Sequence, residues 1–270
     1  MPVIPIESFD DPRLAPYRNL KERDLAREGD RFIAEGENLV KRLLASRYRT
    51  ESVLLADRRV AEIAPLVPEH IPVYSAPASV VNQVLGFKFH AGVMSVGIRG
   101  PSPTIDDVIP PAKEARLTLL VCPEIEKTDN LGAIIRIAAA FGVDAMILGE
   151  RCCDPFFRQS VRVSMGAAFA LPIVRTDDLE RDLKRLQSEF AVQLVGSVLS
   201  ERARSLDTFQ RPQRLALLLG NEAQGLGPQL ESLCDHLVTI PMRLGTDSLN
   251  VAVAAAVFLY ELTKAPEKKK

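Results

Sequence analysis

The second half of the chain alternates short apolar runs with segments of helical periodicity. Residues 117–122 and 145–148 are almost entirely apolar, and residues 131–141 between them have the pattern of a helix. Strands are also expected at residues 192–196, 215–219 and 236–240, before a closing helix at residues 248–264. Strands that are apolar on both faces and joined by helices are typical of a parallel sheet covered on both sides. This half is therefore predicted to have an α/β fold.

The first half has a similar rhythm on a smaller scale. The expected strands are residues 31–34, 52–55, 71–74 and 92–96, and the expected helices lie near residues 37–46, 57–65 and 77–85. Residues 99–112 contain four prolines and no periodicity, which indicates an extended connection. We therefore predict a smaller α/β domain at residues 1–98, a linker at 99–116 and a second domain at 117–270.

Composition excludes several classes of protein. The net charge is −1, so the whole chain has no general affinity for polyanions. Residues 18–59 carry eleven Lys and Arg against eight acids, which fits either a local RNA surface or an ordinary solvated face. The start of the chain lacks a signal peptide, and the apolar run 251–260 is too short to span a bilayer. A cytoplasmic protein without a membrane segment is expected.

The four cysteines and three histidines do not form a metal-binding pattern. No Cys-x-x-Cys spacing occurs, and the adjacent pair Cys152 and Cys153 is a poor disulfide framework. We expect reduced thiols and no metal.

Ligands of parallel sheets bind beyond the carboxyl ends of the strands, so the loops starting at Pro123, Gly220 and Pro241 are candidates. The first leads into the apolar helix that carries Arg136. A charge in a buried helix must be paired or face a cleft, so Arg136 is a candidate site residue, although it could also extend to the surface. Asn130 can cap this helix, and Asn130 and Arg136 are expected to line one wall of a cleft.

The second loop contains Gly220 and Gly225 at the spacing of a phosphate-binding loop. The Lys and Ser or Thr that would hold phosphate and magnesium are absent, and no Gly-x-Gly-x-x-Gly occurs in the chain. Nucleoside triphosphates and dinucleotides are therefore excluded at this loop. A glycine-rich turn beside Glu222 suits an adenosine-type ligand better, although an ordinary tight turn would have the same sequence.

The third loop precedes a helix that is apolar almost all round. Ser248 or Asp247 would make a normal N-cap, and a helix of this kind is either buried or at a subunit interface, of which we expect the interface. The polar groups available for chemistry in these loops are Arg136, Glu222, Ser248 and Asn250. No histidine lies in the loops, so no Ser-His-Asp set can form there.

These segments together resemble the SpoU family of the SPOUT superfamily, which comprises S-adenosylmethionine-dependent RNA ribose 2'-O-methyltransferases. Three motifs carry the resemblance, in chain order: Asn130-Leu-Gly132-Ala-Ile-Ile-Arg136; Leu219-Gly-Asn-Glu222-Ala-Gln-Gly225; and Ile240-Pro-Met followed by Ser248-Leu-Asn250-Val-Ala-Val-Ala254. Residues 162–168 are similar to a further family segment. Residues 35–37 and 90–93 look like parts of the ribosomal-protein-L30e-like domain often fused to these enzymes.

The resemblance implies a C-terminal domain with a trefoil knot, an L30e-like substrate-binding domain and a homodimer. It implies methyl transfer from S-adenosylmethionine to a ribose 2'-hydroxyl of structured RNA, with 23S ribosomal RNA expected ahead of transfer RNA. A non-catalytic RNA-binding scaffold that keeps the knotted fold is the alternative from another class.

The resemblance also assigns roles to residues. The implied cofactor-binding residues are Leu219, Gly220, Asn221, Gly225, Ile240, Met242, Ser248 and Leu249. The implied catalytic residues are Asn130, Arg136, Glu222, Ser248 and Asn250. Because a guanidinium scarcely deprotonates in proteins, Arg136 is expected to stabilise the developing alkoxide, while phosphate, Glu222 or water takes the proton.

Overall fold

The chain folds into two compact units. The computed structural model describes residues 3–18, 30–85, 90–110, 115–200, 202–221, 224–243 and 248–264. Unit 1 comprises residues 1–101 together with 154–170, and unit 2 comprises residues 102–153 together with 171–270. The division after residue 101 falls within the stretch that the sequence predicts as a linker. Residues 154–170 were expected in the second domain, and this placement was wrong.

Unit 1 is built on a five-stranded mixed sheet in the order β1-β4-β3-β5-β2. Its strands are β1 (Val3–Pro5), β2 (Arg31–Glu35), β3 (Arg49–Ala56), β4 (Val73–Ala76) and β5 (Val93–Ile98). Its α-helices are α2 (Glu37–Leu44), α3 (Val60–Ile63), α4 (Ala78–Leu85) and α7 (Arg158–Val163). Short 3-10 turns complete the unit: η1 (Pro12–Tyr17), η2 (Asp57–Arg59), η3 (Ala64–Leu66) and η4 (Ala167–Phe169). The predicted strands and helices of this half are confirmed, and β1 is additional.

Residues 154–170 belong to unit 1 because they complete its aromatic core. The ring of Phe32 on β2 lies 4.9 Å from that of Phe156 and 5.4 Å from that of Phe169, measured between centroids. The ring of Tyr48 packs edge-on against both Phe32 and Phe156 in the same cluster. The guanidinium of Arg158 donates to Glu35 at the end of β2. Without residues 154–170, the apolar side of β2 and α2 would be exposed to solvent.

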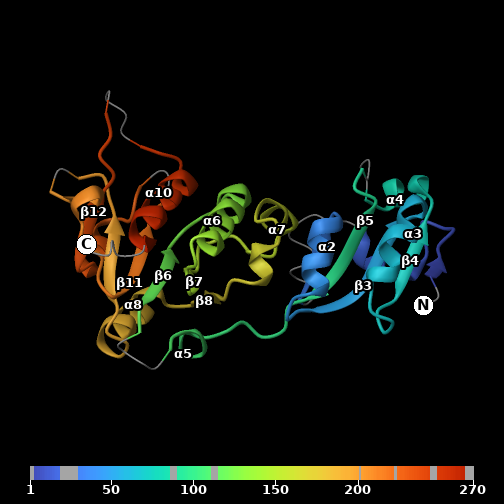
Figure 1. Ribbon diagram of the computed structural model, residues 1–270, viewed down its shortest axis with the longest axis horizontal. Helices are drawn as coiled ribbons and strands as arrows, with labels where there is room; N and C mark the ends of the chain where they lie inside the picture. The colour runs from blue at the N-terminus through green and yellow to red at the C-terminus, as the bar shows by residue number, and fades with distance from the viewer. Residues whose placement is uncertain are drawn as a thin grey trace, which may run out of the picture. The chain divides into compact units, whose positions relative to one another are not determined.

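Unit 2 contains a seven-stranded sheet in the order β10-β12-β9-β11-β6-β7-β8, and every pairing is parallel (Figure 1). The strands are β6 (Leu117–Cys122), β7 (Ala145–Leu148), β8 (Ile173–Arg175), β9 (Gln193–Ser197), β10 (Arg204–Ser205), β11 (Arg214–Leu219) and β12 (His236–Thr239). The helices are α5 (Ile105–Val108), α6 (Thr128–Ala140), α8 (Leu179–Ser188), η5 (Leu206–Thr208), α9 (Pro228–Leu233) and α10 (Val251–Thr263).

The predicted parallel sheet is confirmed, and its central strands are buried on both faces. All six residues of β6 and all six of β11 are buried. Side chains of α5, α8 and α9 join one apolar cluster with alternate residues of the central strands. The helices α6 and α10 pack against each other. Within the described parts of the chain, no helix is long and apolar enough to cross a membrane.

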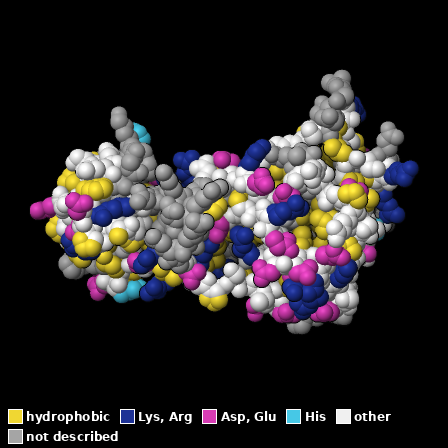
Figure 2. Space-filling model, turned by 180° about the vertical axis from the view of Figure 1, so that it is seen from behind, with side chains coloured by type: hydrophobic (Ala, Val, Ile, Leu, Met, Phe, Trp, Pro, Cys, Tyr) yellow, Lys and Arg dark blue, Asp and Glu magenta, His cyan; other side chains and the backbone are white. Residues whose placement is uncertain are grey.

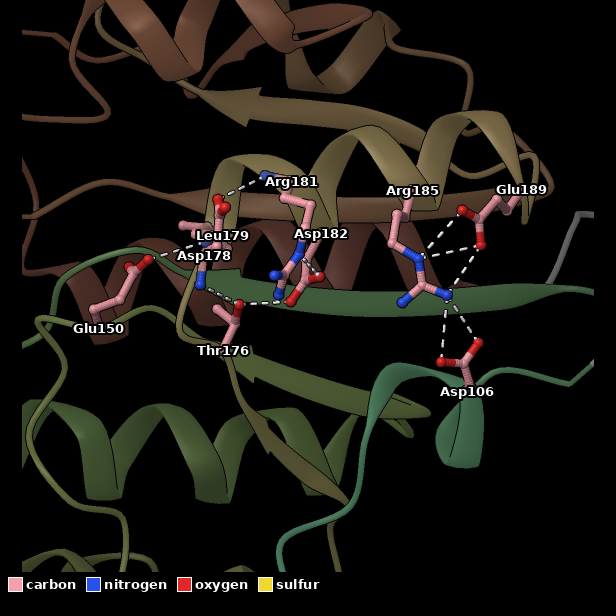
Figure 3. Close-up of polar contacts among 9 residues, drawn as sticks. All are labelled: Asp106, Glu150, Thr176, Asp178, Leu179, Arg181, Asp182, Arg185 and Glu189. Atoms are coloured by element: carbon pink, nitrogen blue, oxygen red, sulfur yellow. Dashed lines mark hydrogen bonds and ion pairs between the residues drawn. The ribbon is translucent and has the colours of Figure 1, made fainter.

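The helix α8 was not predicted from the sequence, because its many charges obscure a narrow apolar stripe. The Asp178 side chain caps it by accepting the backbone N–H of Arg181 (Figure 3). Leu183 on the same helix is fully buried. Arg185 donates to Glu189 one turn later and to Asp106 on α5 (Figure 3). The network holds α5 and α8 together on one face of the sheet.

Candidate active site

A cavity of about 450 Å³ lies at the carboxyl ends of three neighbouring strands, β9, β11 and β12. This is the position at which parallel sheets bind ligands. Its lining residues come from the loops after these strands and from α9 and α10: Ser197, Val198, Leu199, Leu219, Gly220, Asn221, Gln224, Gly225, Leu226, Glu231, Ile240, Met242, Ser248, Leu249, Val251, Ala254 and Phe258.

The cavity brings together all eight residues expected to contact a cofactor. Three distant chain segments supply them: residues 219–225, 240–242 and 248–249. Sequence reasoning missed the loop after β9, which contributes residues 197–199, and missed Glu231 on α9. Ligands of parallel sheets bind beyond the carboxyl ends of the strands, and β9 is one of these strands. The same rule could therefore have identified its loop from the sequence.

The glycine loop after β11 is a tight turn closed on itself. Asn221 and Gly225 exchange two backbone hydrogen bonds of 3.1 Å, and the Asn221 side chain accepts the N–H of Gln224. A Cβ at Gly220 would lie 2.1 Å from the carbonyl carbon of Gly225, so no other residue fits there without moving the backbone. Gly225 has φ +67°, the left-handed conformation that favours glycine. Glu222, expected beside this turn, lies outside the described residues.

The start of α10 differs from expectation in its capping residue. Asn250 is the N-cap, and its Oδ1 accepts the backbone N–H of Ala252 at 2.9 Å. Ser248 is not the cap; it lines the cavity instead, and Asp247 lies outside the described residues. The cap therefore leaves the Nδ2 group of Asn250 available for other contacts.

Asn250 and Asn130 meet across the fold. The Nδ2 of Asn250 donates to Oδ1 of Asn130 at 3.1 Å, which links the first turn of α6 to the loop that enters α10. The prediction that Asn130 caps α6 was wrong, because the N-cap is Lys127 and the helix begins at Thr128, three residues earlier than an Asn130 cap requires. Asn130 thus lies inside the helix, where its side chain is directed outward for this contact.

Arg136 lies on the exposed side of α6. Of the two alternatives that the sequence left open for this charge, extension to the surface is the one observed, because Leu131, Ile134, Ile135 and Ala138 form the buried side of the helix. In the described part of the chain, neither Arg136 nor Asn130 lines the cavity. The two residues therefore do not form a cleft wall within the described cavity.

Three of the eight described basic residues in the stretch 18–59 form ion pairs with described acidic residues. Arg31 forms an ion pair with Glu51, while Lys41 and Arg59 share Glu37. The last two contacts lower the pKa of Glu37, chiefly through the hydrogen bond from Lys41. Acidic and basic side chains are also interspersed on the face in Figure 2. The surplus of positive charge in residues 18–59 therefore does not by itself identify an RNA surface.

The lining suits a small, partly apolar organic ligand with a few polar contacts. Apolar side chains such as Leu226 and Phe258 alternate with exposed backbone and with the polar Ser197, Asn221 and Ser248. This mixture is typical of small-molecule sites, and the volume is in the usual range. Among the described residues, no group of three His, Cys, Asp or Glu side chains could hold a metal ion. The four cysteines are free thiols, as expected.

Comparisons with known proteins identify the same region. Residues 118–260 match the SpoU rRNA Methylase family. An uncharacterised tRNA/rRNA methyltransferase of Mycobacterium tuberculosis is 38% identical over 264 residues, covering 95% of this chain and 90% of the relative. The 23S rRNA (guanosine-2'-O-)-methyltransferase RlmB of Acinetobacter baylyi is 32% identical, covering 76% of this chain and 84% of the relative.

A solved structure extends the similarity to nearly the whole chain. The AdoMet-bound rRNA methyltransferase of Sinorhizobium meliloti superposes with a TM-score of 0.84 at 27% sequence identity. The match covers 96% of this chain and 97% of that protein. The similarity therefore includes both units, beyond the family match at residues 118–260.

Proposed function

The chain belongs to the SpoU rRNA methylase family and is an RNA methyltransferase, and on that premise we propose that it methylates a ribose 2'-hydroxyl of structured RNA. The proposed methyl donor is S-adenosylmethionine and the proposed substrate is 23S ribosomal RNA. The observation that carries the proposal is the cavity, around which eight residues of the second and third motifs converge from three separate chain segments. The similarity to RlmB, a 23S rRNA 2'-O-methyltransferase, supports the choice of substrate.

The cavity fits the cofactor in size and in chemistry. A cavity of about 450 Å³ is large enough for a nucleoside with an amino-acid tail, and its lining has little charge. The backbone exposed by the turn at Gly220 and by Ile240 and Met242 would bind the adenosine, and Leu249 would cover its apolar surface. When bound, the cofactor supplies the electrophilic methyl group.

The chain's own residues must position the ribose oxygen, exclude water and receive a proton. We assign to Arg136 the stabilisation of negative charge that develops on the 2'-oxygen, because an exposed guanidinium can grip an RNA phosphate and an alkoxide together. Asn130 and Asn250 would hold the helix of Arg136 against the loop of Ser248. Glu222, an RNA phosphate or water would accept the proton.

An exposed apolar stripe on α10 supports a homodimer. Three of its members are Val253, Val257 and Tyr260, with Tyr260 59% exposed in the single chain. Their spacing of three or four residues places them along one side of the helix, where a second copy would bury them. We further propose a cytoplasmic enzyme, a trefoil knot in the C-terminal chain and a role for unit 1 as an L30e-like RNA-binding domain.

The test is to map ribose 2'-O-methylation on total RNA from cells with and without the gene. The expected result is loss of one 2'-O-methyl group from 23S ribosomal RNA, restored by the wild-type gene. Loss from a transfer RNA would move the proposal to that substrate. An unchanged methylation map, together with no methyl transfer by the purified protein to RNA from the deletion strain, would favour the non-catalytic scaffold.

A further inference from the structure

The described lining of the cavity carries a single charged side chain, which is negative. Glu231 on α9 is the one ionisable residue among the described residues that line it. The sequence of the surrounding loops has the same bias: residues 220–231 contain Glu222 and Glu231 and no Lys or Arg. Residues 238–251 contain one basic residue, Arg243, which is exposed and absent from the described lining. A ligand in this cavity therefore meets a carboxylate without a compensating cation among the described lining residues.

The position of the Glu231 carboxylate is not explained by a hydrogen bond or an ion pair within the described residues. No hydrogen bond or ion pair joins its carboxylate to any residue that the structure describes, although its backbone groups bond to Gly227 and Cys234. The side chain is half-buried, at the edge of the cavity. One alternative is that the carboxylate only stabilises the first turn of α9 through the helix dipole.

The proposed reaction changes the charge of the cavity's ligand by one unit. S-adenosylmethionine carries a sulfonium cation, which becomes a neutral thioether when the methyl group leaves. A nearby carboxylate attracts the sulfonium form and has no net charge to attract in the product. On the basis of the function proposed above, we propose that Glu231 is a specificity-determining residue that makes the cavity prefer S-adenosylmethionine over S-adenosylhomocysteine.

The experiment is calorimetry of both compounds with the full chain and with Glu231→Gln, which keeps size and polarity and removes the charge. We expect the variant to bind S-adenosylmethionine about five- to tenfold more weakly, with S-adenosylhomocysteine changed by less than about twofold. Added salt should reduce the preference for S-adenosylmethionine in the wild type more than in the variant.

The matched control is Glu189→Gln, which removes the same charge from an exposed side chain of unit 2 that does not line the cavity. It should leave both dissociation constants unchanged. Equal weakening of both compounds by Glu231→Gln, or no change in their ratio, would overturn the inference while leaving the methyltransferase proposal intact. Failure of the wild type to bind either compound would overturn both. Thermal unfolding of the variants tests the alternative role of Glu231 in stabilising α9 through the helix dipole. In that case Glu231→Gln would lower the stability of the protein without changing the ratio of the two dissociation constants.

Discussion

The side chains of Asn130 and Asn250, 120 residues apart in sequence, join at a hydrogen bond of 3.1 Å. Asn250 uses its oxygen to cap α10 and its nitrogen to hold Asn130 on α6. One amide thus serves both the stability of a helix and the placement of the helix that carries Arg136. This double use can be separated experimentally, since the two roles need different atoms.

Asn130→Ala should keep the cap of α10 and lose the link, because it removes the Oδ1 that accepts from Asn250 and leaves the Oδ1 of Asn250 in place. Asn250→Ala should lose both and lower the free energy of unfolding by about 1 kcal/mol, the usual effect of removing a cap. Chemical denaturation and methyl transfer measured on both variants would check this. Full activity of Asn130→Ala would show that the link has no role in catalysis.

Gly220→Ala should abolish cofactor binding, because the added Cβ would collide with the backbone of Gly225 at 2.1 Å and open the turn. Gly227→Ala is the control: that position has φ +75° but open space around it, so strain of about 1 kcal/mol is expected without a collision. Calorimetry with S-adenosylmethionine distinguishes the two. Similar affinities in both variants would contradict the importance of the close approach.

Arg136→Lys should slow methyl transfer by about 100-fold or more, since lysine lacks the planar fork that reaches two oxygens. Arg136 lies on the exposed side of α6 and does not line the described cavity, so the affinity for S-adenosylmethionine should stay within about twofold of the wild type. Single-turnover rates and calorimetry measure the two effects. Near-normal turnover in the lysine variant would remove Arg136 from the proposed mechanism.

Phe169→Ala should destabilise unit 1 by about 3–5 kcal/mol, because the side chain is buried and stacks near Phe32 and Tyr48. Leu66→Ala, at a half-exposed position in the same unit, should change stability by less than about 0.5 kcal/mol. Urea unfolding followed by circular dichroism gives both values. A small effect at Phe169 would contradict the assignment of residues 154–170 to unit 1.

Alkaline pH should destabilise unit 2 through its buried thiols. Burial raises the pKa of Cys152 to about 11 and that of Cys234 to about 12. A raised pKa means that the fold favours the protonated thiol, so this contribution is complete below the unfolded pKa of about 9 and is lost as pH rises toward 11 to 12.

Thermal midpoints recorded from pH 8 to 11 should therefore fall, and Cys234→Ala should flatten part of that fall. Reaction of the native protein with iodoacetamide at pH 8 should be slow at both positions, because the thiolate is the reactive form. Rapid labelling of Cys152 in the folded protein would contradict its burial.

The sequence predicted the elements that have a strong apolar signal. The runs at 117–122 and 145–148 are strands with those bounds, and the parallel arrangement follows from their continuous apolarity. It did not predict α8, where charged residues paired along the helix surface outnumber the apolar residues that pack on the sheet. Hydrophobic periodicity reports the average character of all residues in a segment, and a narrow buried stripe changes that average little.

The site was predictable where motifs and strand ends coincide, as at Gly220 and Met242. The sequence left two positions open for Arg136, a cleft and the surface, because the apolar run 131–141 does not show which side of α6 faces outward. The membership of residues 154–170 in unit 1 depends on aromatic contacts with β2 over more than a hundred residues of sequence. Such contacts leave no local pattern to detect.

The cavity is assembled from segments spread between residues 197 and 258 of the chain. Its walls follow β9, β11 and β12, and residues 248–258 of α10 and its entry loop complete it. A nascent protein in which α10 is still inside the ribosomal exit tunnel therefore lacks a finished pocket. Cofactor binding during synthesis would report that α10 has left the tunnel, and a chain terminated before residue 248 would lack one wall of the cavity.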